Sequence, residues 1–287
     1  MIQGILIPVG GAEDKGTDLE AGIIERNRLN FMEIGILKNI VNFLDTVEAR
    51  IEVITTASSI PDEVAENYVS AFEKLGYKNV GHLRIRDRND VVDPENIARL
   101  KACQCLMFSG GNQLRLSSIF GGTDFLDILL QRYENEKFII AGTSAGAMAM
   151  SATMIYEGNA GRAHLKGEVK LTAGLGFLPG VIIDSHFDKR GRFSRLAQAV
   201  ASNPGAIGLG LGEDTGVIVR HGCELEAIGR GAVTVVDGRN VRHNNIADIE
   251  DHQPISVEGL IVHIMEAGNC YNVKTRVFEL SKNKIEH

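Results

Sequence analysis

The chain has 287 residues, of which 44% are apolar and 6% aromatic, and its formal net charge at neutral pH is −7. This length allows one large α/β domain or two small ones, with a sizeable aliphatic core. The acidic balance argues against nucleic acid as the main partner. No apolar run is long enough to span a membrane, and we expect no signal peptide. The four cysteines, Cys103, Cys105, Cys223 and Cys270, are scattered and lack the spacing of a zinc site, so we expect no metal. Their scatter fits a reducing, cytoplasmic location. We also expect no cofactor.

Strands and helices alternate along the first three quarters of the chain. Apolar runs of strand length are predicted at 5–8, 51–56, 80–85, 105–108 and 138–141, and the pattern recurs at 181–186 and 206–214. Helical spacing is predicted at 29–44, 61–75, 96–100 and, interrupted by Gly121 and Gly122, at 114–130. Such alternation predicts an α/β fold with a mostly parallel sheet covered on both faces. We expect a single domain over 1–287, with 217–287 as β-rich, antiparallel decoration.

The segment 142–147 reads Gly-Thr-Ser-Ala-Gly-Ala and lies between two apolar runs. Strand, tight turn and helix with a serine at the turn are typical of a nucleophile elbow, where small neighbours permit the sharp bend. The Ser144 hydroxyl would then be exposed above the sheet, and the Ala145 N–H would favour developing negative charge. The alternative is a plain glycine–serine turn into a packed helix.

A nucleophilic serine needs a base, and the base needs an orienting acid. Among eight histidines, His186 stands out because it closes an apolar strand at the expected sheet end. Glu213 and Asp214 follow another strand, so they are the candidate acids. A structural histidine and a solvated acidic turn remain the alternatives at these positions. The order serine, histidine, acid differs from that of the α/β-hydrolases.

Two further segments fit such a site. The run 109–113, Ser-Gly-Gly-Asn-Gln, can bring a second backbone donor close to an oxyanion, or be an ordinary turn. A basic cluster follows the histidine and could bind carboxylates or be a solvated surface. It comprises Lys189, Arg190, Arg192 and Arg195.

Together these motifs resemble the cyanophycinase family of serine peptidases, which is related to α-aspartyl dipeptidase. The resemblance rests on 9–15 (Val-Gly-Gly-Ala-Glu-Asp-Lys), 109–114, 142–147 and 184–196, and it extends to about residue 219. It implies a three-layer αβα fold, flavodoxin-like and similar to class I glutamine amidotransferases. It also implies a homodimer and exopeptidase cleavage of cyanophycin, multi-L-arginyl-poly-L-aspartate, to β-Asp-Arg dipeptides through an acyl-enzyme.

The resemblance also implies roles for particular residues. The catalytic triad would be Ser144, His186 and Glu213, with an oxyanion hole at the Gly111 and Ala145 amides. The implied substrate pocket contains Gln113, Asp184, Ser185, Arg190, Arg192 and Arg195. Ser185 departs from the family, which usually has glutamine there, and the segment Gly212–Gly216 departs from the usual Asp-Glu-x-Thr-Ala. These departures concern substrate preference more than the triad.

Two other functions are compatible with the sequence. One is a related serine exopeptidase, similar to aspartyl dipeptidase, that acts on other Asp-containing peptides. The other is a non-catalytic binding module with the same fold, which requires an unreactive Ser144. A glutamine amidotransferase fits less well, because its nucleophile is a cysteine.

Overall fold

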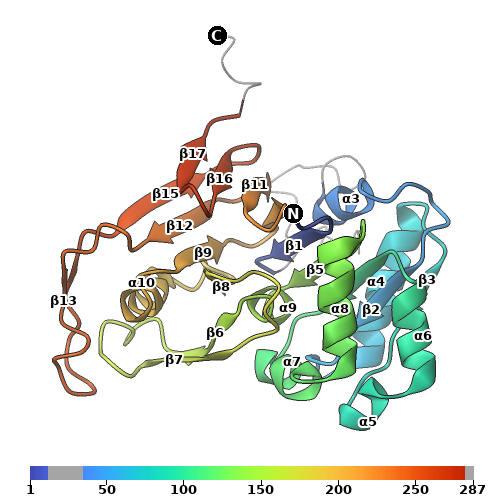
Figure 1. Ribbon diagram of the computed structural model, residues 1–287, viewed down its shortest axis with the longest axis horizontal. Coiled ribbons are helices and arrows are strands. Elements are labelled where there is room, and N and C mark those ends of the chain that lie inside the picture. The colour runs from blue at the N-terminus through green and yellow to red at the C-terminus, as the bar shows by residue number, and fades with distance from the viewer. Residues whose placement is uncertain (12–34, 282–287) are drawn as a thin grey trace.

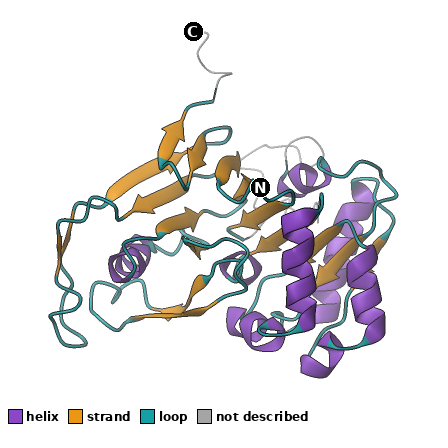
Figure 2. Cartoon of the chain, in the orientation of Figure 1, coloured by secondary structure: helices purple, strands orange, loops and turns teal. Residues whose placement is uncertain are grey.

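A computed structural model describes residues 1–11 and 35–281 (Figures 1 and 2). Within them, nine strands form one mixed sheet in the order β17-β16-β11-β10-β1-β5-β4-β2-β3. Its parallel half consists of β1 (Ile5–Val9), β5 (Ile139–Thr143), β4 (Cys105–Phe108), β2 (Ile51–Ile54) and β3 (Val80–His82). Its antiparallel half consists of β10 (Thr215–Arg220), β11 (Glu224–Gly229), β16 (Cys270–Asn272) and β17 (Val277–Glu279).

A second sheet has the order β15-β12-β9-β8. It consists of β8 (Val181–Asp184), β9 (Ile207–Leu211), β12 (Val233–Asp237) and β15 (Ile261–Met265), and only its β8–β9 pair is parallel. Two small hairpin-like sheets pair β6 (Thr153–Gly158) with β7 (Val169–Ala173), and β13 (His243–Asn244) with β14 (Val257–Glu258). Among the strands after residue 217, β11, β12, β15, β16 and β17 extend the two larger sheets, whereas β13 and β14 pair only with each other. All of these pairings are antiparallel.

Helices cover both faces of the large sheet. On one face, α3 (Ile36–Val41) and α4 (Pro61–Lys74) bury their apolar sides against β1, β2, β4 and β5. On the other face lie α6 (Pro94–Ala102), α7 (Gln113–Phe120), α8 (Asp124–Asn135) and α9 (Ala145–Met148). The short α5 (Arg88–Val91) precedes α6, and α10 (Phe193–Ser202) packs on β9 of the second sheet. The predicted three-layer α/β class is confirmed, with a sheet that is parallel in its centre and mixed as a whole.

Local sequence explains the helix boundaries. Pro61 fits the first turn of α4 because its missing N–H has no helical partner there, and Asp62, Glu63 and Lys74 complement the helix dipole. The predicted break at Gly121 separates α7 from α8. Of the helix predicted at 29–44, residues 29–34 lie outside the described residues, and α3 covers the centre of the remainder.

One packing expectation was wrong. The Cys-x-Cys spacing of Cys103 and Cys105 predicts that both face the same side of a strand, but they lie in the two separate cores on opposite faces of the sheet. The reason is that β4 begins only at Cys105, whereas Cys103 caps the C-terminus of α6, where its thiol donates to the Leu100 carbonyl. In the part of the chain that the structure describes, no helix is long and apolar enough to cross a membrane.

Candidate active site

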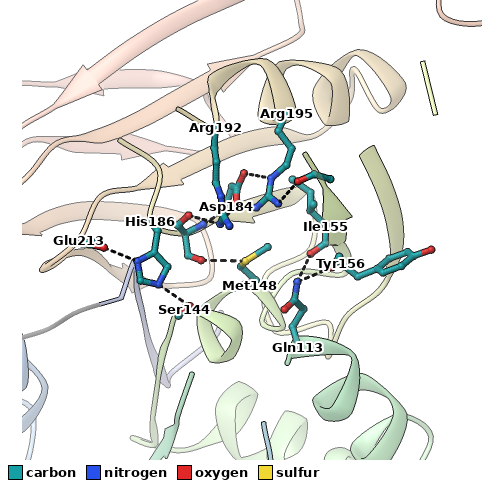
Figure 3. A network of polar contacts seen from close by, with 12 residues as sticks. Gln113, Ser144, Met148, Ile155, Tyr156, Asp184, His186, Arg192, Arg195 and Glu213 are labelled. Carbon is teal, nitrogen blue, oxygen red and sulfur yellow. Dashed lines mark hydrogen bonds and ion pairs between the residues drawn. The ribbon is translucent and has the colours of Figure 1, made fainter. Parts of the chain in front are cut away.

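Three predicted site residues meet where parallel strands end (Figure 3). Ser144 follows β5 directly, His186 lies two residues after β8, and Glu213 lies two residues after β9. In open α/β sheets the carboxyl ends of the strands are the usual location of a ligand site. Ser144 and His186, 42 positions apart, and His186 and Glu213, 27 positions apart, thus converge at the ends of strands from two different sheets.

The backbone at Ser144 bends sharply from strand to helix. Ser144 has φ of 50° and ψ of −109°, outside the regions that side-chain-bearing residues favour. The neighbouring glycines are required by close packing: a Cβ on Gly142 would lie 2.8 Å from the Gly146 carbonyl carbon, and one on Gly146 would lie 2.5 Å from the Phe108 oxygen. The small residues of this segment therefore allow α9 to start tightly against β4 and β5.

A chain of hydrogen bonds runs from the serine to the glutamate (Figure 3). Ser144 Oγ lies 3.0 Å from His186 Nε2, and His186 Nδ1 lies 2.9 Å from Glu213 Oε1. Because a carboxylate only accepts, the imidazole proton belongs on Nδ1, which leaves Nε2 to accept from the serine hydroxyl. This is the arrangement in which a histidine can take the serine proton.

Lys189 contacts the second oxygen of the same carboxylate. Its Nζ forms an ion pair with Glu213 Oε2, although the lysine side chain is 66% exposed. Burial by itself raises the pKa of Glu213, but hydrogen bonds from Lys189 and His186 outweigh it and hold that pKa below its ordinary value. Glu213 is therefore ionised at neutral pH, as an orienting acid must be.

A glycine turn lies beside the serine. A Cβ built on Gly110 would lie 3.3 Å from the Ser144 Cβ, so the two turns are in close contact. The next residue, Gly111, has φ of +139°, and a Cβ there would lie 2.0 Å from the Ala57 oxygen. Only glycine fits this conformation and this space. Ala145 is the first residue of α9, so its N–H has no partner within that helix.

Asp184, which the resemblance places in the substrate pocket, is fully buried and already paired. Arg195 Nε donates to its Oδ2 at 2.8 Å and Arg195 Nη2 to its Oδ1, while Arg192 Nη1 donates to Oδ1 at 3.1 Å. Arg195 is itself only 4% exposed and also donates to the Gly158 carbonyl of β6. In this arrangement Asp184 and Arg195 hold β8, α10 and β6 together, and neither presents a free charge to solvent.

Ser185 also points into the protein. It is 1% exposed, and its hydroxyl donates to Met148 Sδ of α9 at 3.2 Å. Serine is shorter than the glutamine usual in the family, and Met148 packs against it on that side of β8. The Ser185 carbonyl accepts a hydrogen bond of 2.6 Å from Arg192.

The other predicted pocket residues, Gln113, Arg190 and Arg192, carry polar groups that could still contact a substrate. Gln113, at the start of α7, donates from Nε2 to the carbonyls of Ile155 and Tyr156, which fixes the amide and leaves Oε1 as an acceptor (Figure 3). Arg190 is exposed, and no ion-pair partner for it is found among residues 1–11 and 35–281. Burial lowers the pKa of Arg192 to about 10, so this half-buried guanidinium stays charged at neutral pH.

Two contributors were missed in the sequence. Lys189 was recognised only as part of a basic cluster, because nothing in sequence shows that it reaches the glutamate 24 positions later. The backbone of Val9, Gly10 and Gly11 contacts all three site loops, whereas in sequence this segment was recognised only as part of the family motif at 9–15 and was given no role. In the described segments no group of three or more His, Cys, Asp or Glu side chains is placed to hold a metal ion.

A serine–histidine–carboxylate chain at a strand-to-helix turn of an αβα fold, together with a match to a peptidase family, defines the class: the protein is a serine-type peptidase. More particularly, residues 31–228 match the profile of peptidase family S51, and the chain belongs to that family. Among solved structures, a peptidase from an acI-B1 actinobacterium shares the fold, with a TM-score of 0.61 at 20% identity, covering 94% of this chain and 97% of that one.

Curated relatives carry a more specific name. The cyanophycinase of Synechococcus elongatus is 36% identical over 273 residues, which is 95% of this chain and 80% of the relative. The cyanophycinase of Trichormus variabilis is 33% identical over 94% of this chain and 86% of its own length. The cyanophycinase of Geminocystis herdmanii is 32% identical, covering 96% of this chain and 95% of its own.

Proposed function

We propose that this serine peptidase is a cyanophycinase. It would hydrolyse cyanophycin, whose poly-aspartate backbone carries an arginine on each β-carboxyl, and release β-Asp-Arg dipeptides. The nearly full-length similarity to three curated cyanophycinases supports the substrate. The single observation that carries the chemistry is the hydrogen-bonded chain from Ser144 through His186 to Glu213.

The geometry supports the following mechanism. His186 Nε2 takes the Ser144 proton as Oγ attacks the scissile carbonyl, and Glu213 holds the imidazole in the required tautomer and stabilises the imidazolium. The strand-to-helix turn then acts as a nucleophile elbow, and the Ala145 and Gly111 amides form the oxyanion hole. His186 returns the proton to the leaving amine, and water subsequently releases the acyl group from Ser144 by the reverse sequence.

The substrate contacts need revised roles. Each repeat of the polymer carries a free arginyl carboxylate, and two guanidinium groups of the loop after His186 could bind it: Arg190, which is exposed, and Arg192, which is partly accessible. Gln113 Oε1 is available to accept from a substrate N–H. Asp184, Ser185 and Arg195 are proposed to shape this pocket from behind, since all three are buried.

Further properties belong to the same proposal. We expect exopeptidase action, a cytoplasmic location consistent with four free thiols, and a homodimer, as the family resemblance implies. We also treat the whole chain as one domain, because β10 and β12 continue the sheets that carry the site.

The test is incubation of the purified protein with cyanophycin, with mass analysis of the products. Release of β-Asp-Arg is expected. In Ser144→Ala the rate should fall by about 10³-fold or more, while Ser118→Ala, an exposed serine of α7, should behave as wild type. Cleavage of short α-Asp-X peptides alone would favour the aspartyl dipeptidase-like alternative. Failure of Ser144 to react with a fluorophosphonate would favour the non-catalytic alternative.

A further inference from the structure

The backbone that follows β1 is bonded to all three loops of the active site. The Val9 carbonyl accepts from the Ser144 N–H at 2.9 Å, the Gly10 carbonyl from the His186 N–H at 2.8 Å, and the Gly11 carbonyl from the Asp214 N–H at 2.9 Å. Asp214 is the neighbour of Glu213. Three consecutive carbonyls therefore each hold one loop of the triad.

The loops held in this way share an unusual conformation. Ser144, His186 and Asp214 have φ of 50°, 49° and 47°, respectively. Non-glycine residues in this region are strained and persist where surrounding contacts determine them. The hydrogen bonds from the Val9–Gly11 carbonyls supply such contacts, one for each strained residue.

Steric contact makes the two glycines irreplaceable in this arrangement. A Cβ on Gly10 would lie 2.0 Å from the Gly212 oxygen, directly before Glu213. A Cβ on Gly11 would lie 2.4 Å from Cε1 and 2.5 Å from Nε2 of the His186 ring. The backbone thus approaches the imidazole at the nitrogen that must face Ser144.

We propose that the Val9–Gly11 backbone sets the relative positions of the three triad residues, and that Gly11 is a positioning residue for His186. Ser144 comes from the large sheet, whereas His186 and Glu213 come from the second sheet. The extension of β1 joins these two sheets at the point where their residues must meet within hydrogen-bond distance. This inference rests on the proposed catalytic triad but not on the identity of the substrate.

The test compares Gly11→Ala with Gly76→Ala. Gly76 has φ of +92°, similar in sign to the +112° of Gly11, but a Cβ there meets nothing within 4 Å. Both variants therefore carry backbone strain, and only Gly11→Ala pushes on His186. We expect kcat for Gly11→Ala to fall about 10²-fold with little change in KM, since small misplacements of catalytic groups have effects of this size. Labelling of Ser144 by a fluorophosphonate should slow in parallel, and Gly76→Ala should retain both rates.

A second variant removes the group that the new methyl would strike. Gly11→Ala should lower the melting temperature less in the His186→Ala background than in the wild-type background, because the ring that the methyl strikes is then absent. The double variant Gly11→Ala/His186→Ala should also melt at a higher temperature than Gly11→Ala alone. If Gly11→Ala does not fold, the double variant should recover folding. Wild-type labelling rates in Gly11→Ala, or a double variant no more stable than Gly11→Ala, would overturn the proposal. Labelling of Ser144 needs no cyanophycin. If the wild-type protein is labelled normally but does not cleave cyanophycin, the proposed substrate is rejected and this inference still stands.

Discussion

At the scale of single residues, the electrostatics of Glu213 depend on a lysine that is mostly exposed. The pKa of Glu213 is lowered in the folded protein, so its ionisation stabilises the fold above its ordinary pKa of 4.5, and this contribution is lost as pH falls through the lowered value. A protonated Glu213 would no longer be an anion that orients the imidazole. The lysine therefore extends the ionised range of Glu213 toward lower pH.

We expect Lys189→Met to make the enzyme more sensitive to acid. Without the lysine hydrogen bond, Glu213 should protonate at a higher pH. The ratio of kcat/KM at about pH 5 to that at about pH 7 should fall by up to about twofold, because the full effect of an exposed ion pair, about fivefold, is reached only at a pH below the pKa of Glu213. The measurement is a pH–rate profile. Lys170→Met is the control, because Lys170 pairs with Glu157 on the surface. An unchanged profile would show that the Lys189 contact has no effect on the triad.

Ser185 illustrates how a short side chain can be required by packing. Its hydroxyl contacts Met148, and both residues are buried. Ser185→Gln should therefore overpack the β8–α9 contact and lower the free energy of unfolding by about 1–3 kcal/mol.

A double-variant cycle with Met148→Ala tests this reason. The smaller residue should make room for glutamine, so the double variant should be more stable than the sum of the single effects predicts. Urea denaturation gives the four free energies. Additive losses would show that the glutamine is accommodated elsewhere.

At the scale of secondary-structure elements, the Asp184–Arg195 ion pair joins three of them. Arg195 of α10 binds the carboxylate at the end of β8 and the Gly158 carbonyl at the end of β6. A buried charge that loses its partner is strongly destabilising. The pair therefore stabilises the position of β8, and His186 follows that strand by two residues.

We expect Arg195→Ala and Arg190→Ala to have opposite signatures. Arg195→Ala should lower the free energy of unfolding by about 3–5 kcal/mol, because the buried Asp184 carboxylate would then have only Arg192 as a cationic partner. Arg190→Ala should change stability by about 0.5 kcal/mol or less and raise KM, because this exposed residue is proposed to bind substrate carboxylate. Urea denaturation and steady-state kinetics distinguish the two. A stable Arg195→Ala variant with raised KM would return Arg195 to the substrate-contact role expected from sequence.

At the scale of the whole molecule, the active site forms at the junction of two sheets. The proposed nucleophile follows a strand of the large sheet, and the proposed base and acid follow strands of the second sheet, which also carries α10, β12 and β15. In the proposed mechanism His186 activates Ser144, so the reaction needs no metal-bound nucleophile.

We accordingly expect prolonged treatment with EDTA to leave the rate of cyanophycin hydrolysis unchanged. The control is the same treatment followed by added zinc. A loss of activity that zinc restores would contradict the serine mechanism, provided that the melting temperature is unaffected.

Local sequence by itself determined the elements and the chemistry of the candidate site. Alternating apolar runs predicted the strands and helices, because each element must bury one face or stripe. The glycine-rich turn around Ser144 and the strand-closing position of His186 indicated the nucleophile and the base. Each of these signals is contained in a few consecutive residues, so each is readable without a structure.

Only the tertiary structure decided which groups meet and which remain accessible. Asp184 and Arg195 look like free charges in sequence, but they are paired and buried because β8 and α10 pack together. Likewise, the contacts of Lys189 with Glu213 and of Gly11 with His186 join segments that sequence spacing does not relate. Sheet order and crossover connections set these neighbours, and they depend on the packing of the entire chain.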